Sequence, residues 1–239
     1  MSALPRKSLV VTIMAIGIAS TGVPSADTKK PSAISPLPHE LTYDFGHMGI
    51  DFVVQHTYYL VNRSQVPIRI LDAVPSCQCT SVLPLDSLVA PGDSARFRVK
   101  FNSKDFYGPV VKTFRVTTDH PELQEIVYSF TSIVGQWFDG LKPEPVSLFF
   151  LPVHKSRKVT IPNTQYGEIR LSGLGQSDNT YEVNKLTERA GKGQQIELEI
   201  VPKPDLKAGT YQSSLTLTID KKDHEKPTIL TLPVKIVRY

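Results

Sequence analysis

Cysteines and long apolar runs are scarce in this sequence, and each shortage excludes a class of protein. Two cysteines among 239 residues are too few for the disulfide framework of a small secreted domain. The apolar run from Leu9 to Ala19 is well short of the roughly 20 residues that a membrane-spanning helix needs. No long window has the period of an amphipathic helix, and 19 prolines outnumber 14 glycines, so the composition disfavours a helical protein.

The sequence also lacks a strong charge of either sign. Lys and Arg exceed Asp and Glu by 27 to 23, and two of the cations, Arg6 and Lys7, lie in a segment that we expect to be removed. The remaining balance, 25 against 23, disfavours nucleic acid as the main ligand, because nucleic-acid binding requires clustered cations on one face. With 40% hydrophobic and 21% charged residues, the chain is neither disordered nor a multi-spanning membrane protein.

The first 26 residues have the pattern of a secretory signal peptide. Arg6 and Lys7 precede the apolar run, and small residues follow between Ser20 and Ala26, where cleavage is expected. The alternative is a retained N-terminal anchor helix. Residues 27–39, rich in Lys, Pro, Ser and Ala, are predicted to be a flexible spacer. We therefore expect an exported protein, periplasmic or extracellular, with no transmembrane span in the mature chain.

Beyond residue 40 the hydrophobic pattern has a period of two, which predicts strands with one buried face. In residues 95–101, apolar and cationic side chains alternate strictly. Further strands are predicted at 54–61, 68–74, 112–118, 125–134, 155–161, 168–174, 194–201, 213–219 and 228–237. Many short strands at regular spacing, separated by turn residues, indicate an all-β chain folded as an antiparallel sandwich.

An internal repeat indicates two copies of one unit. In the segments Gly108–Asp119 and Gly209–Asp220 the aspartate follows the glycine by 11 positions, and the two segments lie 101 positions apart, which is the usual length of an immunoglobulin-like sandwich. We predict two tandem immunoglobulin-like domains, residues 40–136 and 137–239. Trp137 and Phe138 lie at the joint and are expected to pack between the domains.

Cys77 and Cys79 are the only thiols, and their spacing leaves several interpretations open. In an extended strand their Cβ atoms would lie about 7 Å apart, whereas a disulfide needs about 4 Å, so a bond requires a turn. The alternatives are a structural disulfide, the same bond in redox exchange, two buried thiols, or a soft-metal site for Cu(I) or Zn(II) using both thiolates and a histidine.

His56 is the candidate third ligand for such a metal, because it lies on a strand face that could approach the cysteine pair. The spacing matches no standard metal motif, so a packed histidine at the core edge is the competing interpretation. No motif for a catalytic serine or a carboxylate pair is present, and no catalytic residue or cofactor is predicted. Asn62-Arg63-Ser64 matches the N-glycosylation acceptor pattern, which often arises by chance.

The order of several short segments resembles a known family. Phe45-Gly46, Pro75-Ser76-Cys77-Gln78-Cys79-Thr80 and Ala90-Pro91-Gly92-Asp93 occur in that sequence between predicted strands. This order resembles a bacterial family of exported immunoglobulin-like domains of unknown function marked by a Cys-Gly-Cys-Thr motif, over residues 40–135. Gln78 stands where the family usually has glycine. The second unit resembles the cysteine-free domain that often follows.

These observations favour an exported, non-catalytic interaction or assembly module. We expect recognition through strand edges or end loops, with another exported or cell-envelope protein or a surface polymer as partner. The alternative function is thiol redox chemistry or soft-metal binding at Cys77 and Cys79.

Overall fold

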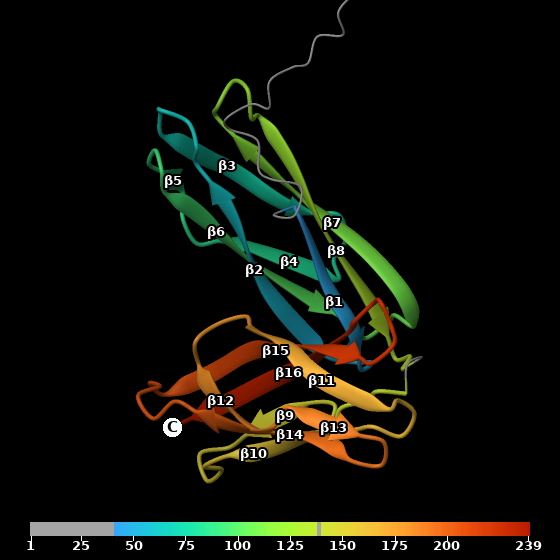
Figure 1. Ribbon diagram of the computed structural model, residues 1–239. Coiled ribbons are helices and arrows are strands. Elements are labelled where there is room, and N and C mark those ends of the chain that lie inside the picture. The colour runs from blue at the N-terminus through green and yellow to red at the C-terminus, as the bar shows by residue number, and fades with distance from the viewer. Residues whose placement is uncertain (1–40, 138–139) are drawn as a thin grey trace, which may run out of the picture. The chain divides into compact units, whose positions relative to one another are not determined.

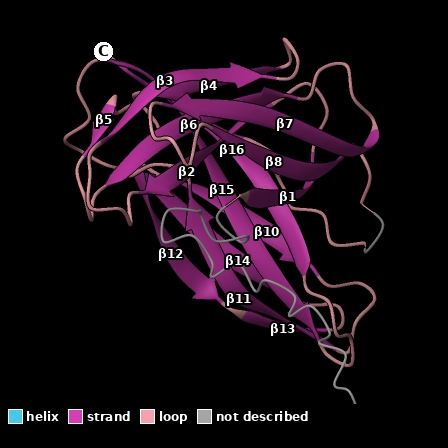
Figure 2. Ribbon diagram, turned by 90° about the horizontal axis from the view of Figure 1, so that it is seen from above, coloured by secondary structure: helices cyan, strands magenta, loops and turns pink. Residues whose placement is uncertain are grey.

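The computed structural model describes residues 41–137 and 140–239, and all regular elements in this part of the chain are β-strands (Figure 2). The all-β prediction is confirmed. The predicted signal peptide and spacer, and Phe138 at the joint, lie outside the described residues.

The first sandwich contains strands β1 to β8 (Figure 1). One of its sheets has the order β1-β8-β7-β3-β5, formed by Thr42–Met48, Glu125–Val134, Gly108–Thr118, Ile68–Pro75 and Leu88–Val89. The facing sheet has the order β2-β6-β4, formed by Val53–Val61, Ser94–Asn102 and Thr80–Pro84. Buried side chains from both sheets form one hydrophobic core.

The second sandwich contains strands β9 to β16 and repeats the same strand order. One sheet is β9-β16-β15-β11-β13, formed by Leu148–Phe150, Thr228–Arg238, Gly209–Lys221, Glu168–Gln176 and Arg189–Gly191. The facing sheet is β10-β14-β12, formed by Arg157–Pro162, Gln195–Pro202 and Tyr181–Thr187. A separate core fills this sandwich. The predicted domain boundaries themselves stay a prediction.

Three strand pairs in the large sheet are parallel, although antiparallel sheets were predicted. The first and last strands pair in parallel in both sandwiches, β1 with β8 and β9 with β16. In addition β1 pairs in parallel with β16, where His47 lies opposite Leu230. One ten-stranded sheet therefore runs through both sandwiches. The described residues, 41–137 and 140–239, belong to one compact unit.

The offset of 101 residues recurs in the hydrogen bonds of a buried corner. Asn62 and Asn163 are fully buried, and each donates its side-chain amide to the carbonyl of a residue 27 positions later, Val89 and Ala190 respectively. The backbone of each asparagine also accepts a bond from a glycine in the left-handed region, Gly92 or Gly193. The two sandwiches therefore share local bonding as well as strand order. Because its side chain is buried, Asn62 is not accessible for glycosylation in the folded protein.

Six strands are not predicted from the sequence, because apolar and polar residues do not alternate in them over enough positions. They are β1, β4, β5, β9, β12 and β13. In β12 only the first residue is buried, and β9 is three residues long. Strand β6 behaves as expected, since Phe97, Val99 and Phe101 are buried while the cations between them face outward.

Candidate functional site

Cys77 and Cys79 are joined by a disulfide in the turn between β3 and β4, with their Cα atoms 5.3 Å apart. Backbone hydrogen bonds hold the turn at both ends. The N–H of Ser76 donates to the carbonyl of Thr113 on β7, and the N–H of Asn102 on β6 donates to the carbonyl of Cys79. The turn required for a bond between cysteines two residues apart is therefore present.

The hydroxyl of Thr80 lies beside both sulfurs of this bond. Its oxygen is 3.6 Å from Cys77 Sγ and 3.7 Å from Cys79 Sγ, and the threonine side chain is buried. Both cysteines are half-buried, and Cys79 packs against the first core while Gln78 between them is exposed. The disulfide is thus accessible from one side and supported by a hydroxyl on the other.

His56, the candidate third ligand, is packed among aromatic rings. Its imidazole stacks on Tyr43 with centroids 3.5 Å apart and meets the edge of Tyr58 at 4.9 Å. Burial lowers the pKa of the His56 imidazole to about 4, so the side chain is neutral at physiological pH. Strand β6 separates β2, which carries His56, from β4, which follows the cysteines.

A soft-metal site would need the two sulfurs and the His56 imidazole to point at one position, and in the structure each of these groups is engaged elsewhere. The two sulfurs are bonded to each other, and His56 is engaged with tyrosine rings. Over residues 41–137 and 140–239, no group of three or more His, Cys, Asp or Glu side chains is placed to hold a metal ion.

Buried polar groups join the two sandwiches at a junction. Gln55 on β2 donates its N–H to Ser214 Oγ at 2.8 Å, and its side-chain amide donates to Asp178 at 2.9 Å. Thr231 on β16 donates its hydroxyl to the carbonyl of Phe45 at 2.6 Å. Gln55, Ser214 and Thr231 are all buried. Such bonds are strong in a low-dielectric interior and would be costly to leave unmade, so they fix the contact between the sandwiches.

Gly46 permits the close approach of β1 to β16 at this junction. Its φ is +61°, and a Cβ at this position would lie 2.1 Å from the carbonyl oxygen of Ile229. Both the backbone conformation and the spacing therefore require glycine. Nearby, His47 stacks on Trp137 with centroids 6.1 Å apart, and Trp137 packs against the second core, so a tryptophan at the joint contacts both sandwiches.

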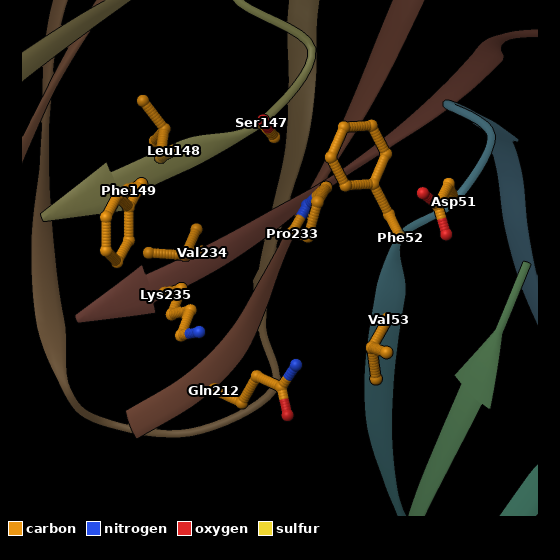
Figure 3. A pocket seen from close by; sticks show the side chains of 10 residues that line it. All are labelled: Asp51, Phe52, Val53, Ser147, Leu148, Phe149, Gln212, Pro233, Val234 and Lys235. Carbon is orange, nitrogen blue, oxygen red and sulfur yellow. The ribbon is translucent and has the colours of Figure 1, made fainter. Parts of the chain in front are cut away.

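A cleft of about 320 Å³ opens beside the junction (Figure 3). Figure 3 shows Asp51, Phe52 and Val53 on one side of it, and Phe149, Val234 and Lys235 on the other. Phe149 is 45% exposed, and Lys235 Nζ lies 5.6 Å from the centroid of its ring. The cleft is therefore apolar, with one acidic and one basic residue among those that line it.

Ser103 holds the Phe52 side of the cleft in place. Its buried hydroxyl accepts a bond from the N–H of Phe52 and contacts the carbonyls of Gly49 and Phe52 at 3.1 Å. Asp51 adopts a left-handed conformation with φ of 62°, which is uncommon for a residue other than glycine. The loop is thus fixed by specific bonds.

The cleft is not predicted by any pattern in the sequence. Phe52 and Phe149 are distant in sequence and belong to no motif, but both line this cleft in the folded protein. An unusual run of apolar residues around Phe149 was the only available signal, and it resembles any buried strand.

Within the described residues, no helix is long and apolar enough to cross a membrane.

Residues 38–133 match the family described as "Protein of unknown function (DUF1573)", and this match covers less than half of the chain. The predicted resemblance of this segment to a family of unknown function is confirmed. The Cys-Gly-Cys-Thr motif and the kinship of the second unit stay predictions. A search of curated proteins found no match.

Several solved structures are similar at low identity. They include a protein of unknown function from Porphyromonas gingivalis W83 (12% identity, 82% of this chain and 96% of that one, TM-score 0.33). The CupB2 chaperone of Pseudomonas aeruginosa also matches, with 12% identity over 80% of this chain and 96% of that one and a TM-score of 0.32. The VesB protease of Vibrio cholerae matches with 10% identity over 73% of this chain and 63% of that one and a TM-score of 0.33. Chaperone and protease match almost equally, and scores this low carry no functional conclusion.

Proposed function

We propose that this protein is an exported, non-catalytic binding module of two tandem immunoglobulin-like domains, 40–136 and 137–239, that presents the junction cleft to a partner protein. The observation that carries the proposal is the cleft itself, which combines the exposed ring of Phe149 and the half-buried ring of Phe52 with a fixed junction. A site whose two walls are held by buried bonds loses little conformational entropy on binding.

The chemistry of the cleft favours a short apolar protein segment as ligand. Its volume is at the lower end of the range of binding pockets, and Phe52 and Phe149 offer apolar area to an inserted side chain. Lys235 already covers one face of the Phe149 ring, which leaves less room for a sugar to stack there. We therefore propose another exported or cell-envelope protein as partner, in preference to a surface polymer.

Binding by strand addition is disfavoured along β4 and along the part of β3 that lies beyond its pairing with β5. On β3 the N–H of Ala73, which points away from β7, already donates to Asp72, and Pro75 has no N–H. On β4 the N–H of Thr80 donates to Cys77, and Pro84 has none. An added strand would find few free donors at these edges.

Several features support a binding role over an enzymatic one. The groups whose pKa values are most strongly shifted by burial are His56, Tyr58 and Tyr181. Burial raises the pKa of both tyrosines, and these three side chains pack against neighbouring rings or the core instead of lining the junction cleft. Shifted groups of this kind serve packing, whereas catalytic groups lie where substrate can reach them.

Site-specific photo-cross-linking tests the proposal. A photoreactive phenylalanine analogue at Phe149 is expected to yield a specific adduct with one protein of the exported fraction. The same analogue at Tyr59, which is 49% exposed and lies outside the junction cleft, serves as the matched control. Substitution Phe52→Ser should weaken the adduct at Phe149 by about tenfold, the loss expected for one buried aromatic anchor. Equal labelling from both positions would contradict the proposal.

A further inference from the structure

The second sandwich contains a cysteine-free counterpart of the disulfide turn, which shows that a turn of this kind can form without a disulfide. Asp178 and Thr180 lie 101 positions after Cys77 and Cys79. Their turn is held by equivalent backbone bonds, from Ser177 N–H to the carbonyl of Ser214 and from Lys203 N–H to the carbonyl of Thr180. In place of a covalent bond, the Thr180 hydroxyl donates to the Asp178 carboxylate at 2.7 Å.

The disulfide also contributes little as a cross-link. In the chain-entropy description, a bond that closes a loop of three residues stabilises the folded state much less than a bond that closes a long loop. Since the backbone bonds of Ser76 and Asn102 hold the turn independently, both sulfurs would remain close together after reduction. The oxidised and reduced forms can therefore share one fold.

We propose that Cys77 and Cys79 form a reversible dithiol–disulfide site that exchanges electrons with external dithiol reductants, and that Thr80 stabilises the thiolate formed on reduction. A hydroxyl gains little from a neutral disulfide sulfur, but a hydrogen bond to a thiolate is charge-assisted and lowers the pKa of that thiol. Thr80 is placed beside both sulfurs. Lys100, on β6 and diagonally across from Cys79, adds positive charge on the neighbouring strand.

The order of bond changes follows from the packing of the two cysteines. Cys79 packs against the core, so the thiolate of the reductant attacks Cys77 Sγ. The Cys77–Cys79 bond breaks, Cys79 leaves as a thiolate that accepts the Thr80 hydrogen bond, and a mixed disulfide forms at Cys77. The second thiol of the reductant, as a thiolate, then attacks the reductant sulfur that is bonded to Cys77 Sγ. Cys77 leaves as a thiolate, and both cysteines are protonated from water. Two electrons and two protons pass to the protein, and the reductant becomes a disulfide.

The first test reduces the folded full-length mature protein with dithiothreitol in the absence of denaturant and counts thiols by alkylation and mass spectrometry. The expected result is that both cysteines become alkylated while the far-ultraviolet circular dichroism is unchanged, and that oxidised glutathione restores the bond. Alkylation only after denaturation would overturn the proposal.

The second test separates the roles of the three residues. With oxidised glutathione, the single thiol of Cys79→Ser should form a mixed disulfide about tenfold faster than that of Cys77→Ser, because Cys79 packs against the first core. In the Cys77→Ser background, Thr80→Val should raise the pKa of the Cys79 thiol, measured by thiolate absorbance, by about one unit, and Thr80→Ser should restore it. Equal rates, or a pKa that is insensitive to Thr80→Val, would contradict these assignments. Failure of the cross-linking experiment at Phe149 would leave them untouched, because they do not depend on the cleft.

Discussion

The two sandwiches have one strand order and two different kinds of core. The first core contains many buried aromatic side chains: Phe45, Tyr58, Phe97, Phe101, Phe114, Tyr128 and Phe130. The second is mostly aliphatic, with Phe150 and Tyr181 as its buried rings. The shared features are polar or conformational, namely the buried asparagines and the glycines with positive φ. The difference teaches that topology here depends on these corners, and that the core tolerates repacking when its volume and pattern are kept.

The largest effect is expected at the paired asparagines. Asn62→Ala and Asn163→Ala should each lower the free energy of unfolding by about 3–4 kcal/mol, because each leaves the buried carbonyl of Val89 or Ala190 without its donor. Urea denaturation measures both losses. A loss below about 1 kcal/mol in one variant, with the full loss in the other, would break the equivalence of the two corners.

A smaller loss is expected at the junction glycine. Gly46→Ala should destabilise the protein by about 3 kcal/mol, since its Cβ would collide with the backbone of Ile229 in addition to straining the backbone. Gly92→Ala and Gly193→Ala are matched controls with similar positive φ and open space around the added Cβ, and each should cost about 1 kcal/mol. Thermal unfolding that ranks Gly46→Ala with the two controls would contradict the close approach.

The stability of the first sandwich should depend on pH through His56. Its pKa is about 4 when folded and about 6.5 when unfolded, so between these values the unfolded state binds more protons. The contribution of the neutral His56 imidazole to the free energy of unfolding is therefore fully present above pH 6.5. It is lost as the pH falls towards 4, by up to about 3 kcal/mol. Urea midpoints at several pH values measure it. His56→Gln should have a flatter profile, and an unchanged profile would exclude His56 as the cause.

The smallest effect is expected from removing the disulfide. The double variant Cys77→Ser, Cys79→Ser should lose about 1.5 kcal/mol or less of stability, because the closed loop is so short. Its circular dichroism should match that of the unaltered protein. A loss above about 3 kcal/mol would show that the first sandwich depends on its cross-link in a way that the second does not.

How much of this could be predicted depended on the range over which a pattern acts. Strands such as β6 and β8 alternate along their own length, so local sequence predicts them, whereas β12 is exposed over most of its residues and gives no such signal. The 101-residue repeat was visible at Gly108 and Gly209. Its most informative pair, Asn62 and Asn163, was not recognised, since a buried asparagine and a glycosylation acceptor look alike in sequence.

The site was less predictable than the fold. The cysteine spacing indicated that any bond requires a turn, and the structure has that turn, but no local pattern places Thr80 beside both sulfurs. The cleft arises from the pairing of β1 with β16, and a contact between strands so far apart in sequence leaves no local periodicity. Strand parity predicts only which face of its strand His56 lies on, whereas its stacking on Tyr43 depends on β1, a different strand.

The central claim is that the buried bonds of Gln55, Ser214 and Thr231 hold the two sandwiches in one arrangement, so that the cleft exists before a partner arrives. Double electron–electron resonance tests this claim most directly, by measuring the distance between spin labels at Leu88 on β5 and Leu186 on β12, which are both exposed. We predict a single narrow distance distribution in the unliganded protein. A broad distribution, or several populations, would contradict a preformed cleft.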